Sequence, residues 1–288
     1  MQSVVVTGVS TGIGWGITKV LIQRGLRVFG SVRKTQDAER LSKEFGELFV
    51  PLLFDVTDEA AVQAAAQYVR EQLNGEKLFG LINNAGIAAP GPLIHLPTED
   101  FRHQLEVNLV SVLIVTKAFA PLLGVDRSLR GQPGRIINIS SVSGKSAFPF
   151  VGAYATSKHG LEGFSETLRR ELILYGIDVI IVGPGPIATP IWDKAEQADP
   201  SLYVNTDYGE AAQRAKDFMV HNGRRGLAPE KVGEVVWQVL TARSPHTRYA
   251  VVGRGALQRF IEQLLPKRLI DRIVARALGL ERRTPKTN

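Results

Sequence analysis

The stretch Val4-Val5-Val6-Thr7-Gly8-Val9-Ser10-Thr11-Gly12-Ile13-Gly14 decides the fold, because a strand pattern passes through a glycine-rich turn into a helical pattern. Three valines without polar alternation are typical of a strand buried on both faces. Glycines let a backbone approach a pyrophosphate, and the following helix presents free N–H groups and the positive end of its dipole. The turn indicates a nucleotide site, although its spacing is not the common G-x-G-x-x-G, and alone it is equally consistent with a tight turn.

Strand and helix patterns alternate through the rest of the chain. The expected strands cover residues 4–6, 26–32, 48–54, 78–82, 135–139, 178–182 and 249–252, and the expected helices cover 14–24, 37–45, 58–73, 99–123, 153–175 and 229–241. Crossovers of this length predict an α/β fold, with a right-handed, doubly wound parallel sheet of Rossmann type.

Two segments interrupt this alternation. Residues 188–226 form a long stretch of mixed polarity, and loops of that length inside compact domains usually act as lids or binding loops. Residues 254–288 form a basic extension in which apolar residues recur at helical spacing. We therefore predict a single catalytic domain over residues 1–253 with a helical lid at 188–226, followed by a basic amphipathic C-terminal helix within 254–288.

Composition excludes several kinds of site. The 288 residues are 44% hydrophobic and 22% charged, which is ordinary for a globular protein and argues against disorder. The chain has no cysteine, which excludes disulfides, thiolate metal sites and a cysteine nucleophile. Its five histidines show no ligand spacing, so we expect no metal.

Most of the net charge of +7 lies in residues 254–288, where nine basic residues accompany three acidic ones. The nearly neutral body argues against nucleic-acid binding. No basic-then-apolar signal segment leads the chain, and no apolar run approaches the roughly 20 residues of a membrane-spanning helix. We therefore expect a soluble, cytoplasmic protein.

Two further segments carry chemistry. Tyr154 and Lys158 are four residues apart at the start of a helix, so they project from one face. A neighbouring ammonium favours the phenolate and lowers the pKa of a tyrosine. Upstream, Ser140 and Ser141 leave the carboxyl end of a strand, where open α/β sheets place their ligands. Each segment alone also fits a solvated helix or a loop hydroxyl, but together they indicate a catalytic site.

These segments resemble the short-chain dehydrogenase/reductase family, in its compact rather than its extended branch. The matching markers stand in family order over residues 4–189: the glycine loop, Asp55, Asn83-Asn84-Ala85-Gly86, Asn108, Ser141, Tyr154, Lys158 and Pro184-Gly185-Pro186-Ile187-Ala188-Thr189. The stretches Gly91-Pro92-Leu93 and Pro266-Lys267-Arg268-Leu269 are similar to the retinol and hydroxysteroid dehydrogenase members.

The resemblance implies catalytic roles for four residues. Tyr154 would be the general acid in reduction and the general base in oxidation, and Lys158 would lower its pKa and hold the nicotinamide ribose. Ser141, rather than Ser140, matches the family serine and would hydrogen-bond the substrate oxygen where charge develops. Asn108 would hold a water in a proton relay to the lysine.

The resemblance also implies a nicotinamide cofactor, which carries the hydride chemistry itself. Asp55 would bind the adenine amino group, and Ile187 and Thr189 the carboxamide, whereas Asn83 either contacts the adenosine half or braces the sheet. The residues expected to bind the cofactor are Gly8, Ser10, Thr11, Gly12, Ile13, Gly14, Arg33, Asp55, Val56, Asn83, Ala85, Gly86, Tyr154, Lys158, Pro184, Gly185, Ile187 and Thr189.

The end of the second strand favours NADP(H) over NAD(H). An acidic residue there would bond the ribose 2′-OH of NAD and repel a 2′-phosphate. Val32 stands in its place and Arg33 follows, so we predict Arg33 on the 2′-phosphate with Ser31 assisting. Thr11 stands where many NADP-binding relatives carry a second basic residue, so NAD(H) remains the alternative.

The lid indicates a lipophilic alcohol, ketone or aldehyde as the substrate. Its bulky residues are Trp192, Tyr203, Tyr208, Phe218 and Met219, with Phe148, Pro149 and Phe150 before the tyrosine helix, although such residues pack as ordinary core just as often. The C-terminal helix is expected to pack over the pocket or at a subunit interface, with peripheral membrane contact as the alternative.

Family members usually associate through the helices expected at 99–123 and 153–175, which implies a homodimer or homotetramer. The alternatives to the predicted enzyme are a catalytically idle NADP(H)-binding sensor or scaffold, and an NAD-preferring dehydrogenase of a small carbonyl compound. A dehydratase or epimerase on the same fold is disfavoured by the glycine spacing.

Overall fold

A parallel sheet organises the chain, as the sequence predicts. The computed structural model describes residues 1–197, 203–253 and 265–281. Over this part of the chain the sheet has seven parallel strands in the order β3-β2-β1-β4-β5-β6-β7. The strands are β1 (Ser3–Val6), β2 (Arg27–Val32), β3 (Phe49–Leu53), β4 (Gly80–Asn83), β5 (Arg135–Ile139), β6 (Asp178–Pro184) and β7 (Arg248–Val251).

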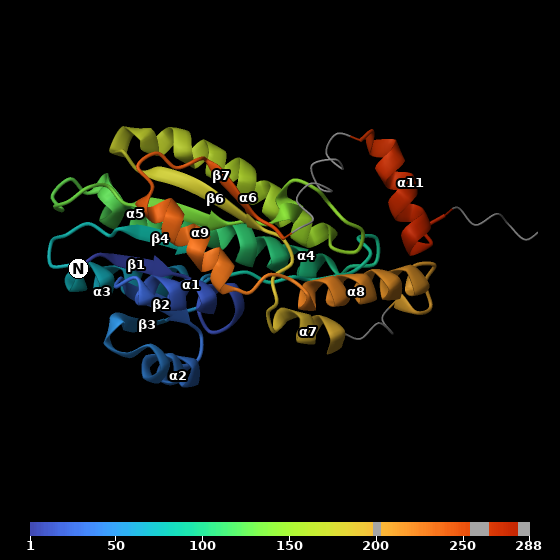
Figure 1. Ribbon diagram of the computed structural model, residues 1–288, viewed down its shortest axis with the longest axis horizontal. Coiled ribbons are helices and arrows are strands. Elements are labelled where there is room, and N and C mark those ends of the chain that lie inside the picture. Colours follow the sequence, from blue (N-terminus) through green and yellow to red (C-terminus); the bar gives the residue numbers. More distant parts are fainter. Residues whose placement is uncertain (198–202, 254–264, 282–288) are drawn as a thin grey trace, which may run out of the picture.

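Helices cover both faces of this sheet (Figure 1). The helices of the described residues are α1 (Gly12–Gln23), α2 (Thr35–Phe45), α3 (Glu59–Gln72), α4 (Thr98–Leu105), α5 (Ser111–Ala120), α6 (Gly152–Glu171), α7 (Ile191–Gln197), α8 (Gly209–Arg224), α9 (Glu230–Thr241) and α11 (Lys267–Leu278). Successive strand residues face opposite sides. Val5 therefore packs with α3 and α5, whereas Val4 and Val6 pack with α1 and α9.

Two glycines allow α1 and α9 to pack at short range. A Cβ on Gly16 would lie 2.6 Å from the Pro229 backbone, and a Cβ on Gly233 would lie 2.8 Å from the Gly16 carbonyl oxygen. Because backbone atoms cannot move aside cheaply, a larger residue at either position would push the helices apart. This contact holds the start of α1, and with it the glycine loop, against the C-terminal half of the chain.

The helix expected at 99–123 contains two π-helical turns. The π-turn η2 (Glu106–Val110) separates α4 from α5, and a second, η3 (Pro121–Val125), follows α5. Among the described residues, the helix Thr98–Val125 is long enough to cross a membrane and contains an 18-residue window with a mean hydropathy of 1.8, so the expectation that no apolar run approaches this length is wrong. By burial, 61% of that window lies inside the fold, and core helices of soluble proteins pass the same test.

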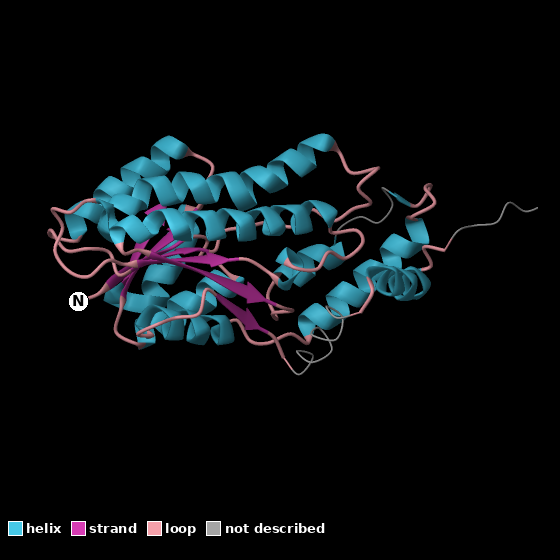
Figure 2. Cartoon of the chain, turned by 90° about the horizontal axis from the view of Figure 1, so that it is seen from above, coloured by secondary structure: helices cyan, strands magenta, loops and turns pink. Residues whose placement is uncertain are grey.

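The helices α7, α8 and α11 lie beyond one end of the sheet. Figure 2 shows the strand arrowheads pointing towards the end where α7, α8 and α11 gather. Leu278 of α11 is buried against Ala211 and Ala215 of α8 and against Phe150. The carboxyl ends of the strands therefore open towards the lid, where α/β sheets bind their ligands.

Candidate active site

The loop between β1 and α1 has a shape that only glycines allow. Gly8 and Gly12 adopt positive φ angles of 70° and 64°. A Cβ on Gly14 would overlap the Gly8 carbonyl oxygen and lie 2.5 Å from Asn84 Nδ2. The Asn84 amide donates hydrogen bonds to the carbonyl oxygens of Thr7 and Gly8, which ties the loop to the end of β4. The spacing of the three glycines therefore follows from the path of this loop.

The same loop fits a dinucleotide pyrophosphate. Thr11 is the N-cap of α1, yet its side chain makes no capping hydrogen bond, so the N–H groups of the first turn keep their capacity to bind an anion. A Cβ on Gly12 would lie 3.4 Å from Thr189, which places the segment after β6 directly beside the loop. Ile187 is buried on the same segment, just beyond Pro184 and Gly185 at the end of β6.

The adenosine end is defined by the exits of β2 and β3. Arg33 pairs with Asp55 at 3.5 Å, and its side chain is 72% exposed. Partial burial of Asp55 opposes ionisation, but hydrogen bonds from Thr57 and the charge of Arg33 hold the pKa of Asp55 below its ordinary value. Val56 beside it is buried. An arginine and a carboxylate thus stand together where an adenine ribose would lie.

Ser31 differs from its expected role at a 2′-phosphate. Its side chain is buried, and its Oγ accepts a hydrogen bond from the Gly8 N–H at 2.9 Å. The Ser31 side chain, at the end of β2, therefore supports the glycine loop from within the protein. The sequence analysis missed Arg40 of α2, which contacts the same loop from its exposed side. Arg40 donates a hydrogen bond to the Ser10 carbonyl oxygen at 2.6 Å.

Tyr154, Lys158 and Ser141 converge beyond the carboxyl end of β5. Tyr154 and Lys158 lie one turn apart on α6, with the Lys158 ammonium 5.7 Å from the centre of the tyrosine ring. Lys158 is buried and donates to the Ile139 carbonyl oxygen at 2.8 Å. Ser141 acts on Tyr154 by lowering the pKa of the tyrosine, and its Oγ accepts from the Ser143 N–H at 3.0 Å, whereas the Ser140 hydroxyl is buried and makes no hydrogen bond. The geometry thus selects Ser141, as the spacing does.

The protonation of this group differs from the sequence expectation. Desolvation raises the pKa of Tyr154, opposed only in part by the hydrogen bond from Ser141. Desolvation also lowers the pKa of Lys158 to about 8, while the nearby Glu162 carboxylate raises it. Burial therefore sets the direction of the Tyr154 pKa shift, while the Lys158 ammonium is turned towards the Ile139 carbonyl.

Two asparagines next to the site, Asn108 and Asn83, make hydrogen bonds within the protein. Asn108 lies in the π-turn η2, accepts from the Ile87 N–H and donates to the Ile87 carbonyl oxygen and to Ser157. Asn83 donates to Asn138 and Thr116 inside the sheet. Asn83 thus takes the bracing role. Ala85 and Gly86 pack beside these groups, since a Cβ on Gly8 would meet Ala85 and one on Gly86 would lie 3.2 Å from Asn108 Oδ1.

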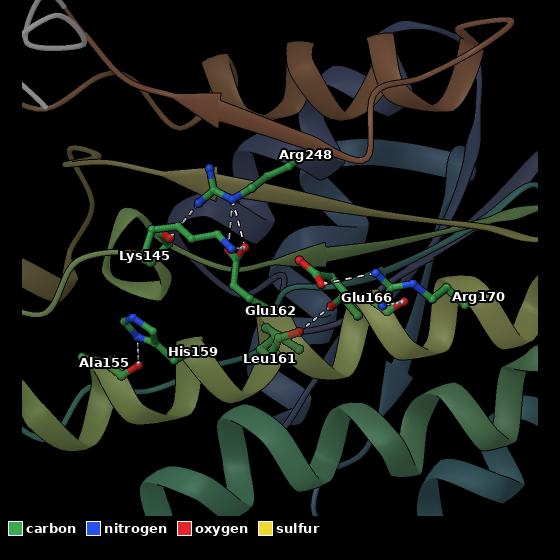
Figure 3. A network of polar contacts seen from close by, with 10 residues as sticks. Lys145, Ala155, His159, Leu161, Glu162, Glu166, Arg170 and Arg248 are labelled. Carbon is green, nitrogen blue, oxygen red and sulfur yellow. Dashed lines mark hydrogen bonds and ion pairs between the residues drawn. The ribbon is translucent and has the colours of Figure 1, made fainter. Parts of the chain in front are cut away.

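An ion cluster around the buried carboxylate of Glu162, which the sequence analysis did not find, adjoins the site (Figure 3). Glu162 of α6 binds Arg248 of β7 at 3.0 Å and Lys145 at 3.3 Å. Arg248 also donates to the Ser141 carbonyl oxygen at 3.3 Å. The signal available in the sequence was the four-residue spacing Tyr154, Lys158, Glu162, which places all three on one helix face. Among the described residues, no group of histidine, aspartate and glutamate side chains could hold a metal ion.

Comparison with known proteins defines the class. The family model described as short chain dehydrogenase matches residues 2–200. The NADPH-dependent 3-dehydrocapnine reductase of Ornithobacterium rhinotracheale is 38% identical, over 95% of this chain and 96% of its own. Human 17-beta-hydroxysteroid dehydrogenase type 6 is 34% identical over 95% and 88% of the two chains, and human retinol dehydrogenase 5 is 35% identical over 94% and 87%.

A solved structure supports the same fold. A short chain dehydrogenase/reductase of Burkholderia phymatum, in complex with NAD, superposes with a TM-score of 0.75 at 22% identity, over 91% of this chain and 92% of its own. The chain belongs to the short-chain dehydrogenase family. It is a nicotinamide-dependent oxidoreductase of the type that interconverts an alcohol and a carbonyl compound.

Proposed function

We propose that this chain is an NADP(H)-dependent oxidoreductase that interconverts a lipophilic alcohol and its ketone or aldehyde, with Tyr154 as the acid/base. The observation that carries the proposal is the placement of a half-buried Tyr154 and a buried Lys158 one helical turn apart, with the lysine ammonium 5.7 Å from the tyrosine ring centre, beside the loop that carries Ser141. A glycine loop shaped for a pyrophosphate faces the same end of the sheet.

Each side chain has a distinct part in this chemistry. The nicotinamide supplies the hydride in reduction and accepts it in oxidation. Tyr154 gives its phenol proton to the carbonyl oxygen in reduction and takes the hydroxyl proton in oxidation. Ser141 donates a hydrogen bond to the oxygen on which charge develops. Lys158 holds its ammonium beside the pair, and its charge favours the phenolate when the proton leaves.

The preference for NADP(H) rests on Arg33. Its guanidinium is exposed at the exit of β2, where it could leave Asp55 for a 2′-phosphate, and Arg–phosphate pairs are strong and bidentate. The O. rhinotracheale relative is named as NADPH-dependent. Removing Arg33 should therefore reduce the preference for NADPH over NADH by about 10- to 100-fold, the equivalent of one charged hydrogen bond.

The lipophilic substrate rests on aromatic residues around the lid. Phe148 stacks on Phe218 of α8 with ring centres 5.7 Å apart, and Phe150 meets Tyr208 edge-on at 6.1 Å. Met219 and Val274 pack beside them. The relatives are named for retinol, hydroxysteroids and 3-dehydrocapnine. We therefore propose that a bulky apolar substrate binds beside α8.

The decisive experiment follows NADPH and NADH absorbance with long-chain ketones, steroids and retinoids as substrates. Tyr154→Phe should abolish turnover and keep NADPH binding, measured by fluorescence titration, while Tyr68→Phe, an exposed tyrosine on α3, keeps both. Arg130→Ala is the control for Arg33→Ala, because Arg130 is equally exposed and paired with a carboxylate. Full turnover by Tyr154→Phe would refute the mechanism, and NADPH binding without turnover of any substrate would favour the idle sensor.

We propose that the enzyme binds its substrate at a membrane surface. Leu269 and Ile273 of α11 are exposed, while Leu278 on the same helix packs against α8. Arg272 and Arg276 flank the exposed residues at helical spacing. This combination suits the headgroup region of an anionic bilayer, which attracts basic side chains while apolar ones enter the acyl boundary.

Liposome co-sedimentation tests the membrane proposal. The chain should sediment with vesicles of phosphatidylcholine and phosphatidylglycerol but not with phosphatidylcholine alone. Ile273→Glu should abolish sedimentation. Ile173→Glu should not, because Ile173 is an even more exposed apolar residue in the 3-10 turn that follows α6. Absence of binding to both vesicles, or equal loss in both variants, would leave α11 as a helix that packs over the pocket or between subunits.

A further inference from the structure

Glu162 is a buried carboxylate surrounded by cations. It lies on α6 one turn beyond Lys158, and its side chain is 4% exposed. Its two oxygens accept from Arg248 Nε at 3.2 and 3.0 Å, and Lys145 Nζ lies 3.3 Å from one of them. Figure 3 shows Lys145, from the loop after β5, and Arg248, from β7, facing Glu162. The third charged group is Lys158, one turn before Glu162 on the same helix.

Two glycines provide the room for this cluster. A Cβ on Gly144 would lie 3.0 Å from Glu162 Oε1, and a Cβ on Gly183 in β6 would lie 2.6 Å from Arg248 Nη2. A buried charge cluster is not an economical way to stabilise a fold, because well-packed apolar residues of similar volume often do as well or better. The combination of two glycines and three cations around one carboxylate indicates a function beyond packing.

The cluster connects directly to the groups of the proposed reaction. Arg248 Nη2 donates to the carbonyl oxygen of Ser141, and Lys145 stands at the other end of the same loop, just after the 3-10 turn η4 (Val142–Gly144). Both ends of the loop that carries Ser141 are therefore tied to Glu162. On the other side, the negative charge of Glu162 raises the pKa of Lys158 against the effect of burial.

We propose that Glu162 and Arg248 are positioning residues that fix the Ser141 loop against the face of α6 that carries Tyr154 and Lys158. The Glu162 carboxylate, one helical turn beyond Lys158, also favours the charged form of that lysine. The inference rests on the proposed function of Tyr154, Lys158 and Ser141. Neither residue contacts the reacting atoms. They act through the placement of the serine and the charge of the lysine.

The first test compares Glu162→Gln with Glu166→Gln. Glu166 lies one turn further along α6, is exposed and pairs only loosely with Arg170, so it serves as a matched control. Glu162→Gln should lower kcat by about 10- to 100-fold, the cost of a misplaced catalytic group, with an unchanged KM for NADPH. Its alkaline limb of kcat/KM should move to lower pH, because Lys158 loses its proton more readily without the carboxylate. Glu166→Gln should match the wild type in all three.

The second test does not depend on turnover. Lys158 can be titrated by NMR of the chain labelled with ¹³C-lysine, with its signal assigned by Lys158→Met. The pKa should lie near 8 in the wild type and fall in Glu162→Gln. Arg248→Lys keeps a cation beside Glu162 but loses the reach to the Ser141 carbonyl, so it should lower kcat while the pKa of Lys158 stays unchanged.

These results separate the two proposals. An unchanged Lys158 titration and an unchanged kcat in Glu162→Gln would overturn the positioning role, and in a chain without turnover an unchanged Lys158 titration alone would do so. A fall in the pKa of Lys158 in a chain without any turnover would instead support the cluster and reject the proposed reaction. If Glu162→Gln fails to fold, Arg248→Lys decides, because a kcat equal to the wild type would exclude the link to Ser141.

Discussion

A methyl group added at Gly14 should lower the stability of the fold, whereas the same methyl group at Gly163 should raise it. Both glycines lie in helices, where alanine is favoured over glycine by about 1 kcal/mol. Gly163 is exposed and a Cβ there meets nothing within 4 Å, so Gly163→Ala should gain that full amount. At Gly14 the new Cβ would overlap the Gly8 carbonyl oxygen and crowd Asn84, and such overpacking costs about 3 kcal/mol in a rigid loop.

The net loss at Gly14 is therefore about 2 kcal/mol, while Gly163→Ala gains about 1 kcal/mol. For a chain of this size 1 kcal/mol corresponds to a shift in Tm of about 2–4 °C. Differential scanning calorimetry without cofactor should show Gly14→Ala melting about 4–8 °C below the wild type, and fluorescence titration should show that it no longer binds NADPH. If Gly14→Ala melted above the wild type and bound NADPH normally, the loop would be more plastic than these contacts imply.

Two further predictions concern stability and assembly. Burial lowers the pKa of Lys158 from 10.5 to about 8, so below pH 8 the native state keeps a buried charge at a cost of up to about 3 kcal/mol, and the cost fades as the pH rises from 8 to 10.5. Lys158→Met should therefore raise Tm at pH 7, and the gain should vanish near pH 10.5; a gain independent of pH would reject this origin. A homodimer or homotetramer remains a prediction: light scattering should give two or four times 31.5 kDa, and Leu113→Glu, on the exposed face of α5, should shift the mass towards one chain, whereas a monomeric wild type would reject it.

The sequence predicted the sheet and the central groups because their signals are local. Runs such as Val4-Val5-Val6 identify buried strands, and the four-residue spacing of Tyr154 and Lys158 fixes their common face. The π-turn at Asn108 was not predicted, since one extra residue per turn barely changes an apolar helix pattern. Contacts between residues far apart in the sequence were not predicted either. Ser31 was expected to assist at a 2′-phosphate, but in the fold its hydroxyl accepts a hydrogen bond from the Gly8 N–H.

Glu162 shows the same limit most clearly. In the sequence it is one acidic residue on a helix that also carries Glu166 and Arg170, and such residues are usually solvated. Its burial depends on Gly144, Gly183 and Arg248, which reach it only through the order of strands β5, β6 and β7. The four-residue spacing from Lys158 indicates only the helix face of Glu162, and it does not identify the distant residues that bury the carboxylate.

The late position of Arg248 in the chain also determines when the ion cluster can form during synthesis. It lies on β7, the last strand of the described chain, 86 residues after Glu162. At a synthesis rate of roughly 5–20 residues per second, a nascent chain spends roughly 4–17 s with Glu162 made and its arginine partner not yet added. During that interval the Ser141 carbonyl lacks its guanidinium donor. A ribosome-bound or truncated chain that ends before β7 would thus carry every residue of the proposed chemistry in an unfinished arrangement, so activity would report that translation has reached the end of the sheet.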